Sequence, residues 1–339
     1  MKKVTLQDVA DHAAVSKSTV SQYLNGRYTY MGEQTKRRIE ESIRTLQYQP
    51  NAIARSLKQK KTTTIGVIMA NILHRVSTQT SRAIEDFCHA KGYHVILCNA
   101  DDDSEKEKQY IEMLKAKQVD GFIIYPTASN EEMYKSLLDE KYPVVFLDRK
   151  VKALSIPTLT LRNEEAMDWA IEHLKNQGNE SIAYISSPLT ISPRTERYDG
   201  FLSSMKRHGL TIQQDLIYTD KLSDSTSFLK KIFSPGHFPD AILSSNDRSL
   251  VPVLDYLKKT FKGVPEHLSI LTFDEVEYAE FFQPSITTVE QPAFEMGTKA
   301  AELLIDQIDH DGLQHLDDYY FGFQGKLNIR ESSLKRGRD

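Results

Sequence analysis

The chain has 339 residues, of which 40% are hydrophobic and 27% are charged. This balance predicts a globular protein of two or three domains and excludes an intrinsically disordered chain. No apolar run reaches the roughly 18 residues of a membrane span, and charges follow Met1 directly, so we expect neither a membrane segment nor an export signal. Cys88 and Cys98 fit no zinc or redox spacing. A reduced cytoplasm is the expected compartment, and we expect no metal or other cofactor.

The net charge of -4 is distributed unevenly along the chain. Residues 1–61 contain 12 Lys and Arg against 5 Asp and Glu, a net charge of +7, and the remainder carries -11. A basic segment in front of an acidic remainder predicts a polyanionic partner for the N-terminal part alone. The alternative is a solvated charged face without a partner.

Three short helices are expected in the basic segment. Residues 5–8 (TLQD) have the spacing of a capping box, with Thr5 as the N-cap. Ser16 is a second N-cap, and the helix behind it should end at Asn25-Gly26. A third helix is predicted over residues 33–46. The first two helices, joined by three or four residues, form a helix-turn-helix unit.

The exposed face of the second helix is short and polar, with Lys17, Ser18, Ser21 and Gln22. Such side chains suit a helix in the major groove, because Gln bonds two edge atoms of adenine and Lys reaches guanine. The alternative is a small helical subdomain that binds no DNA.

Four motifs together resemble the LacI/GalR family of bacterial repressors: VTLQDVA at 4–10, VSKSTVS at 15–21, YQPNAIARSL at 48–57 and TIGVI at 64–68. The similarity continues to about Glu302. It implies an all-α helix-turn-helix head and an α/β body like that of periplasmic binding proteins, with two doubly wound parallel-sheet lobes. Within the family, the sequence is similar to repressors of 2-keto-3-deoxygluconate catabolism.

The resemblance also implies a hinge over residues 48–61. In the family this segment forms a short helix only on operator DNA and inserts a leucine, here Leu57, into the minor groove. A segment this short is not a stable helix alone, and an apolar wedge kinks a duplex. The alternative is that Leu57 packs on the next domain. The expected DNA-binding residues are Thr5, Ser16, Lys17, Ser18, Ser21, Gln22, Asn25, Asn51, Ala54 and Leu57.

Two residues depart from the family pattern. Ala14 replaces the usual Gly of the turn, so we expect slight backbone strain there. Gln22 replaces the usual Arg, so we expect a half-site other than the family's commonest one.

From Thr64 onward, β-rich runs alternate with helical patterns, which predicts parallel sheets with right-handed crossovers. Strands are expected at 65–69, 95–98, 122–125 and 144–147, then at 182–185, 216–218, 241–244 and 269–273, with tail strands near 319–323 and 326–330. Helices are expected at 165–175, 196–208, 247–261 and 294–308, and a capping box at 104–107 should open another. The predicted domains are the head (1–47), the hinge (48–61) and the body (62–339). Within the body, the N-lobe comprises 62–161 plus 292–322, and the C-lobe comprises 162–291 plus 323–335.

Ligands of open parallel sheets bind beyond the carboxyl ends of the strands. Polar residues in those positions are therefore the expected effector ligands. Three of them, Arg197, Asn246 and Asp274, coincide with sugar-binding positions of the resembled family. The full expected set is His74, Arg75, Ser77, Asp101, Arg149, Arg194, Arg197, Asn246 and Asp274.

Five arginines on these loops (75, 149, 194, 197 and 248) exceed what a neutral sugar requires. Arginine forks match carboxylate or phosphate oxygens, and a helix expected to open at Ser77-Thr78 also favours an anion. We therefore expect an anionic effector, either a sugar acid or a sugar phosphate. Structural roles remain open for others: Asp247 as an N-cap, Asp148 as an ion-pair partner and Arg248 as a surface charge.

The sequence thus predicts a repressor that binds a near-palindromic operator as a homodimer and responds to an effector. The effector acts as inducer or, alternatively, as co-repressor. A transport-type solute-binding protein is the first rival, since it shares the two-lobed body. An enzyme is not expected, because we find no Gly-rich phosphate loop, no nucleophile elbow and no metal-spaced His or Cys set.

Overall fold

The computed structural model describes residues 4–49, 61–127, 129–152, 154–234, 236–310 and 319–335. The contacts divide the chain into two units, residues 1–62 and 63–339. The expected hinge residues Asn51, Ala54 and Leu57 lie outside the described residues.

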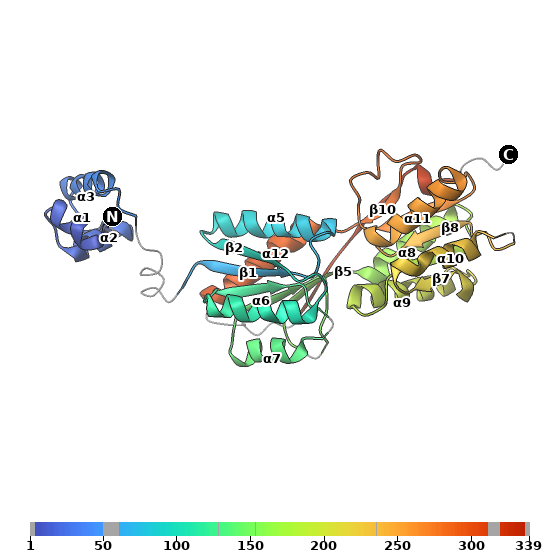
Figure 1. Ribbon diagram of the computed structural model, residues 1–339, viewed down its shortest axis with the longest axis horizontal. Coiled ribbons are helices and arrows are strands. Elements are labelled where there is room, and N and C mark those ends of the chain that lie inside the picture. Colours follow the sequence, from blue (N-terminus) through green and yellow to red (C-terminus); the bar gives the residue numbers. More distant parts are fainter. Residues whose placement is uncertain are drawn as a thin grey trace. The chain divides into compact units, whose positions relative to one another are not determined.

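The described residues of the first unit form three helices around one small apolar core (Figure 1). They are α1 (Leu6–His12), α2 (Lys17–Leu24) and α3 (Glu33–Thr45). Val9, Val20 and Ile39 each contribute a fully buried side chain, one from each helix. The three predicted helices are therefore present, and the predicted helix-turn-helix unit is confirmed.

The first half of the second unit is a six-stranded sheet in the order β11-β5-β4-β3-β1-β2, with all pairs parallel. Helices α5 and α12 cover one face of the sheet, and α6 and α7 cover the other (Figure 1). The strands are β1 (Thr64–Met69), β2 (His94–Asn99), β3 (Gly121–Ile124), β4 (Val144–Leu147), β5 (Thr158–Leu161) and β11 (Tyr320–Phe323). The helices are α5 (Arg75–Ala90), α6 (Ser104–Ala116), α7 (Glu131–Asp139) and α12 (Ala293–Asp309). We call this layer set the N-lobe.

The C-lobe repeats the pattern with the sheet order β12-β10-β9-β8-β6-β7, in which only β12 is antiparallel to its neighbour. Helices α8 and α9 pack on one face, and α10 and α11 pack on the other. The strands are β6 (Ile182–Ser186), β7 (Ile217–Thr219), β8 (Ala241–Ser244), β9 (Ser269–Phe273), β10 (Thr287–Glu290) and β12 (Lys326–Asn328). The helices are α8 (Asn163–Asn176), α9 (Ser192–Arg207), α10 (Ser225–Ile232) and α11 (Asp247–Phe261).

The chain passes between the two sheets three times, after β5, after β10 and after β11. The first two crossovers carry Asn163 and Gln291, whose side chains are both buried. Residues on these connecting segments therefore lie beside the junction of the lobes. We found no helix in the described ranges that is long and apolar enough to cross a bilayer.

Three expectations about helix starts are wrong. The helix expected to open at Ser77-Thr78 begins at Arg75, with His74 as its N-cap. Helix α6 is capped by Asp103, whose side chain accepts from two backbone N–H groups, so residues 104–107 form no capping box. Helix α11 is capped by Asn246 and not by Asp247. In each case the N-cap residue lies upstream of the expected position, and in α6 and α11 its side chain accepts from free backbone N–H groups.

Other elements were missed because their sequences carry weak patterns. Strands β5 and β10 are buried but contain Thr at alternate or successive positions, and the short helices α7 and α10 were not expected. Helix α9 begins at Ser192, four residues before the expected start, with Pro193 in its first turn. Proline suits that position because its missing N–H has no helical partner there.

A buried histidine in the C-lobe should make stability depend on pH. The Nε2 atom of His173 lies 2.7 Å from Ser333 Oγ, and burial lowers the pKa of His173 below 6.5. The unfolded chain therefore binds this proton at a higher pH than the folded chain does. The buried, neutral His173 therefore contributes to the free energy of unfolding in full above pH 6.5, and this contribution is lost as the pH falls below that value. We expect urea unfolding to show a smaller stability loss between pH 7 and pH 5 for His173→Gln than for the native chain, and equal losses would contradict the assignment.

Candidate functional site

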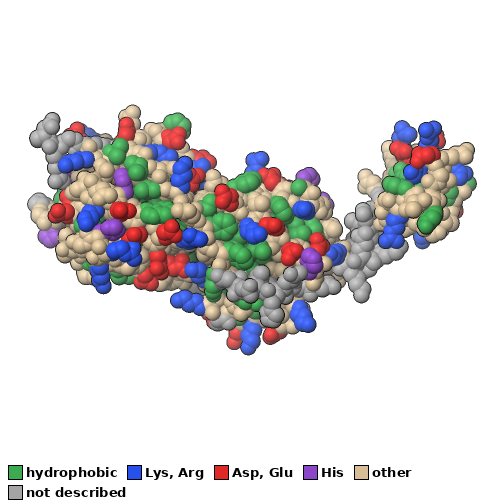
Figure 2. Space-filling view, turned by 180° about the vertical axis from the view of Figure 1, so that it is seen from behind, with side chains coloured by type: hydrophobic (Ala, Val, Ile, Leu, Met, Phe, Trp, Pro, Cys, Tyr) green, Lys and Arg blue, Asp and Glu red, His purple; other side chains and the backbone are tan. Residues whose placement is uncertain are grey.

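The predicted DNA-reading face lies on α2 and at its ends. Lys17, Ser18 and Gln22 have exposed side chains, and Ser21 is half-buried. Ser18 and Gln22 are four residues apart on α2, as are Lys17 and Ser21, so the members of each pair are neighbours on the helix surface. Figure 2 shows Lys and Arg side chains exposed on this unit. Such a surface suits a phosphate backbone flanking a groove.

Three other predicted DNA-binding residues also stabilise helix ends. Thr5 closes a capping box with Asp8, and Ser16 Oγ accepts from Thr19 N at 3.1 Å. Asn25 Nδ2 donates to the carbonyl of Ser21 at 2.7 Å. These contacts confirm the predicted caps, and they leave DNA contact by the same residues a prediction.

The turn between α1 and α2 has the strain expected from its sequence. Ala14 has a φ of 51°, in the left-handed region where glycine is favoured. The Ala14 N–H is held by the carbonyl of Asp11 at 3.2 Å, and the following Val15 N–H bonds Ala10 O at 3.0 Å. The surrounding turn therefore holds an unfavourable backbone conformation in place.

A small cavity lies between the two lobes at the carboxyl ends of their strands. Residues from both lobes line it, and seven of the nine predicted effector residues are among them: His74, Ser77, Arg149, Arg194, Arg197, Asn246 and Asp274. Its free volume is about 50 Å³, far below the roughly 300–1,000 Å³ of typical ligand pockets. A sugar-sized molecule therefore enters only when the lobes separate or the lining side chains move. We call this cavity the cleft.

Two arginines in the cleft, Arg149 and Arg194, lie close enough for their charges to interact, and each leaves one buried guanidinium nitrogen without a hydrogen bond among the described residues. Arg149, only 5% exposed, donates from Nη2 to Asp102 Oδ1 at 2.7 Å and from Nη1 to the carbonyl of Pro126. Arg194 donates from Nη1 to the carbonyl of Pro188. Within the described ranges, the buried Nε atoms of both arginines have no hydrogen-bond partner. Burial, and next the charge of Arg149, lower the pKa of Arg194. An anion with several acceptor oxygens would give the buried Nε atoms hydrogen-bond partners and would also offset the repulsion between the two positive charges.

Arg197 lies three residues after Arg194 on α9 and is held by more partners. Its Nε donates to Asn163 Oδ1 at 2.8 Å, and its Nη1 donates to the carbonyl of Ser245 at 2.6 Å. The guanidinium lies over the Phe273 ring at 4.6 Å, and its Nη2 is 3.9 Å from Asp274 Oδ1. The position of this arginine is therefore fixed by neutral and charged partners together.

Asp274 and Asn246 complete this side of the cleft. Burial raises the pKa of Asp274, although Arg197 opposes the rise, and Gln291 Nε2 donates to its Oδ1 at 2.5 Å. Asn246 Oδ1 accepts from Ser249 N at 2.9 Å, which is its capping role in α11. The buried Gln291 Oε1 has no partner among the residues that the structure describes. Acceptors and donors for ligand hydroxyl groups therefore line the same cleft as the Arg149–Arg194 pair.

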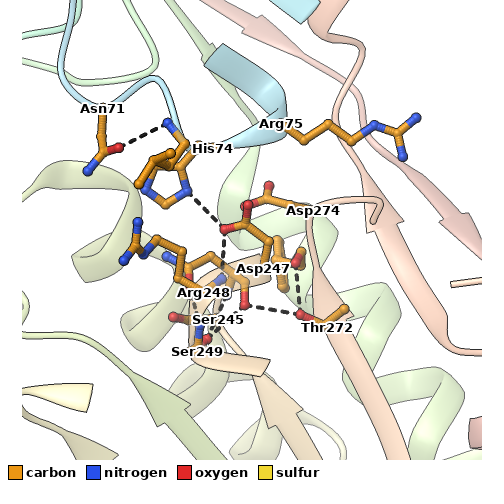
Figure 3. Close-up of polar contacts among 12 residues, drawn as sticks. Asn71, His74, Arg75, Ser245, Asp247, Arg248, Ser249, Thr272 and Asp274 are labelled. Atoms are coloured by element: carbon orange, nitrogen blue, oxygen red, sulfur yellow. Dashed lines mark hydrogen bonds and ion pairs between the residues drawn. The ribbon is translucent and has the colours of Figure 1, made fainter. Parts of the chain in front are cut away.

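One rim of the cleft is closed by a contact between the lobes (Figure 3). His74 Nδ1, at the start of α5, lies 2.9 Å from Asp247 Oδ1, at the start of α11. Burial acts to raise the pKa of Asp247, but His74 and the backbone N–H groups of Arg248 and Arg75 lower it below its usual value. The Asp247 carboxylate is thus stabilised by the N-termini of two helices, one from each lobe.

Two predicted effector residues do not lie in the cleft. The Asp101 carboxylate is exposed and pairs with Lys106 Nζ at 2.5 Å, whereas the next residue, Asp102, reaches Arg149. Arg75 points away from Asp247 (Figure 3) and lines an outer groove together with Arg248. The placement of Asp101 and Arg75 as cleft residues is therefore corrected. Gln291 and Asp102 were missed because no local pattern distinguishes them.

The described residues offer no group of three His, Cys, Asp or Glu that could hold a metal ion. The side chains that line the cleft offer guanidinium, carboxylate, amide, imidazole and hydroxyl groups for hydrogen bonds to a ligand.

Two family models match the chain. The model "Bacterial regulatory proteins, lacI family" matches residues 5–51, and "Periplasmic binding protein-like domain" matches residues 171–332. Among solved structures, the lac repressor dimer bound to operator and the anti-inducer ONPF aligns with a TM-score of 0.84 at 23% identity, covering 98% of this chain and 100% of that one. This likeness confirms the predicted fold: a helical head and a two-lobed α/β body.

Curated relatives match over almost the whole length. The probable HTH-type transcriptional regulator EndR of Paenibacillus polymyxa is 43% identical, covering 98% of each chain. The ribose operon repressor of Halalkalibacterium halodurans is 33% identical over 97% of each, and the regulator KdgR of Bacillus subtilis is 30% identical over 91% of this chain and 92% of its own. These similarities show that the chain belongs to the LacI family of bacterial regulatory proteins.

Proposed function

We propose that this DNA-binding regulator is a repressor whose operator affinity is lowered by an anionic sugar effector, a sugar acid such as 2-keto-3-deoxygluconate. The observation that carries the proposal is the pair of buried Nε atoms of Arg149 and Arg194, neither of which has a hydrogen-bond partner among the described residues. Arg149 already pairs with Asp102 at 2.7 Å, but its charge still lowers the pKa of Arg194, so a further anion beside both guanidinium groups would favour their charged forms. A carboxylate accepts from two guanidinium groups at once, so it matches this pair.

The remaining cleft residues suit the hydroxyl groups of the same ligand. Arg197 and Gln291 supply donors, and Asp274 and Gln291 supply acceptors, in the same cleft as Arg149. A sugar acid has both an anionic end and a polyol end. The proposed effector therefore uses both sets of cleft residues.

A neutral sugar is the second candidate effector, since Asp102, Asp148 and Asp274 offset part of the arginine charge. A relative named as a ribose operon repressor supports this class. Isothermal calorimetry of the full chain against 2-keto-3-deoxygluconate, glucose 6-phosphate and ribose separates the possibilities. We expect the sugar acid to bind tightest. Binding of ribose alone would overturn the proposal of an anionic effector. Binding of glucose 6-phosphate alone would change the proposed effector from a sugar acid to a sugar phosphate.

The direction of the response is tested by operator affinity. If the effector binds the off-operator state better, it weakens DNA binding and acts as an inducer. Gel-shift titration with and without 2-keto-3-deoxygluconate should show release. Tighter DNA binding in its presence would make the effector a co-repressor.

Reading of the operator by Gln22 gives a specific prediction. Gln22→Ala should relax the preference at one base position of each half-site by about 1–3 kcal/mol, because a bidentate contact to adenine is lost. Affinities for a duplex selected by the native chain from a random pool, and for its single-base variants, measure this. Gln34→Ala, also exposed but at the start of α3, is the matched control. An unchanged base preference in Gln22→Ala would remove Gln22 from the interface.

We further propose that two copies bind a near-palindromic operator as a homodimer. The outer groove has a volume of about 760 Å³ and is lined partly by the exposed apolar side chains of Leu73, Val251 and Tyr278. Phe281, 84% exposed, follows Tyr278 on the same loop. A second copy of the chain that covers this surface would remove it from water. Sedimentation should show a dimer that Val251→Glu converts to a monomer, and a native monomer would contradict the proposal.

A further inference from the structure

Asn163 lies at the point where the chain first crosses from the N-lobe sheet to the C-lobe. It is the first residue of α8, two residues after the end of β5, and its side chain is 2% exposed. Sequence patterns gave no reason to select it, because an Asn at a helix start ordinarily caps the helix. Here Arg162 is the N-cap, and the Asn163 side chain makes no cap bond. Its polar atoms are used elsewhere.

The Asn163 amide joins two charged groups that differ in sign. Its Oδ1 accepts from Arg197 Nε at 2.8 Å, and its Nδ2 donates to Glu196 Oε2 at 2.8 Å. Arginine can only donate and an ionised carboxylate can only accept, so this pairing fixes the amide orientation. Aspartate lacks the donor, and alanine lacks both groups. Of these side chains, only the amide satisfies both neighbours at this position.

Glu196 extends the connection to the other lobe. Its second oxygen, Oε1, lies 2.8 Å from Lys150 Nζ, in the N-lobe segment that follows β4. The backbone N–H of Lys150 also donates to Ser192 Oγ of α9 at 2.8 Å. Lys150 directly follows Arg149 in the chain, so the connection runs from one cleft arginine towards the other.

We infer that Asn163 is a positioning residue, which orients the Arg197 guanidinium for the effector and links it through Glu196 to Lys150 of the N-lobe. The ligand role of Arg197 in this inference rests on the proposed function. Its orientation by Asn163 does not. With Nε and Nη1 held by Asn163 and Ser245, the guanidinium plane is fixed before a ligand arrives, which lowers the cost of binding.

The direct test observes Arg197 itself and needs no effector. In the full chain labelled with ¹⁵N-arginine, the Arg197 Nε–H resonance is assigned by its absence from Arg197→Lys. We expect Asn163→Ala to accelerate exchange of this proton with solvent by at least about tenfold, because a bond to a charged donor is lost. Asn163→Asp retains an acceptor and should keep the proton protected. Glu196→Gln should also keep the proton protected, since it leaves the Arg197–Asn163 bond in place.

The outcomes separate this inference from the proposed function. An unchanged Arg197 exchange rate in Asn163→Ala, or a lost protection in Asn163→Asp, overturns the positioning role whatever the effector is. If Asn163→Ala does not fold, Asn163→Ser replaces it, since the shorter hydroxyl cannot reach both partners. With 2-keto-3-deoxygluconate as probe, Asn163→Ala should bind at least about tenfold more weakly than the native chain, while Asn163→Asp should recover part of that loss. Failure of the native chain to bind this probe counts against the proposed effector only.

Discussion

A fragment that begins at Thr63 should lose all operator affinity and still fold. Every predicted DNA-binding residue lies before that point, and residues 63–339 form a separate unit by their contacts. The fragment also carries the negative share of the charge, so a duplex repels it. Fluorescence anisotropy with a duplex selected by the full chain should show no binding at low salt. Retained affinity would place the DNA-binding surface in the body.

The control for this truncation is the integrity of the body. Urea unfolding of the fragment should give a cooperative transition, because its lobes keep their own cores. The full chain should lose affinity steeply as salt rises, since phosphate contacts release counterions. A full chain whose binding ignores salt would contradict a basic head that contacts the backbone.

Arg197→Ala should abolish the effector response and leave DNA binding intact. The substitution removes a buried cation that faces Asp274 and whose Nε and Nη1 donate to Asn163 and Ser245. Loss of one member of a buried pair costs about 3–5 kcal/mol, and because burial raises the pKa of Asp274 while Arg197 opposes the rise, the substitution should raise that pKa further. Dose–response curves of DNA release by 2-keto-3-deoxygluconate measure the effect.

Arg207→Ala is the matched control for this variant. Arg207 lies at the end of the same helix, α9, with 60% of its side chain exposed, and pairs with Asp168 at the surface. Its loss should cost little, as for other surface pairs. A normal dose response in Arg197→Ala, or an abolished one in Arg207→Ala, would remove Arg197 from the effector site.

The sequence predicted correctly those helix caps that depend on interactions between residues close together in the chain. The caps at Thr5 and Ser16 depend on atoms within four residues, and both formed as expected. The box expected at 104–107 failed because Glu107 instead binds Thr127 N at 2.9 Å, a partner 20 residues away. No window of local sequence contains that competitor, so the pattern alone could not exclude the box.

The cleft was predicted in outline by the rule that ligands bind beyond strand ends, and seven of the nine residues converge there. The rule does not decide which neighbour turns inward. Asp101 and Asp102 both have positive φ values, 54° and 58°, yet only Asp102 reaches Arg149. The rim arginines likewise separate into Arg149, Arg194 and Arg197 inside and Arg75 and Arg248 outside, by helix geometry that the sequence does not display.

The placement of Asn163 and Gln291 on crossover segments has a consequence for anyone who redesigns this protein as a biosensor. Gln291 lines the cleft, Asn163 holds the cleft residue Arg197, and both amides lie on segments that connect the two sheets. Substitutions selected at these two positions for binding of a new compound should change the connection between the lobes as well as the ligand selectivity. The affinity for the compound and the size of the response should therefore change together. Ser77 and Ile191 line the same cleft from other segments and are the better sites for independent tuning.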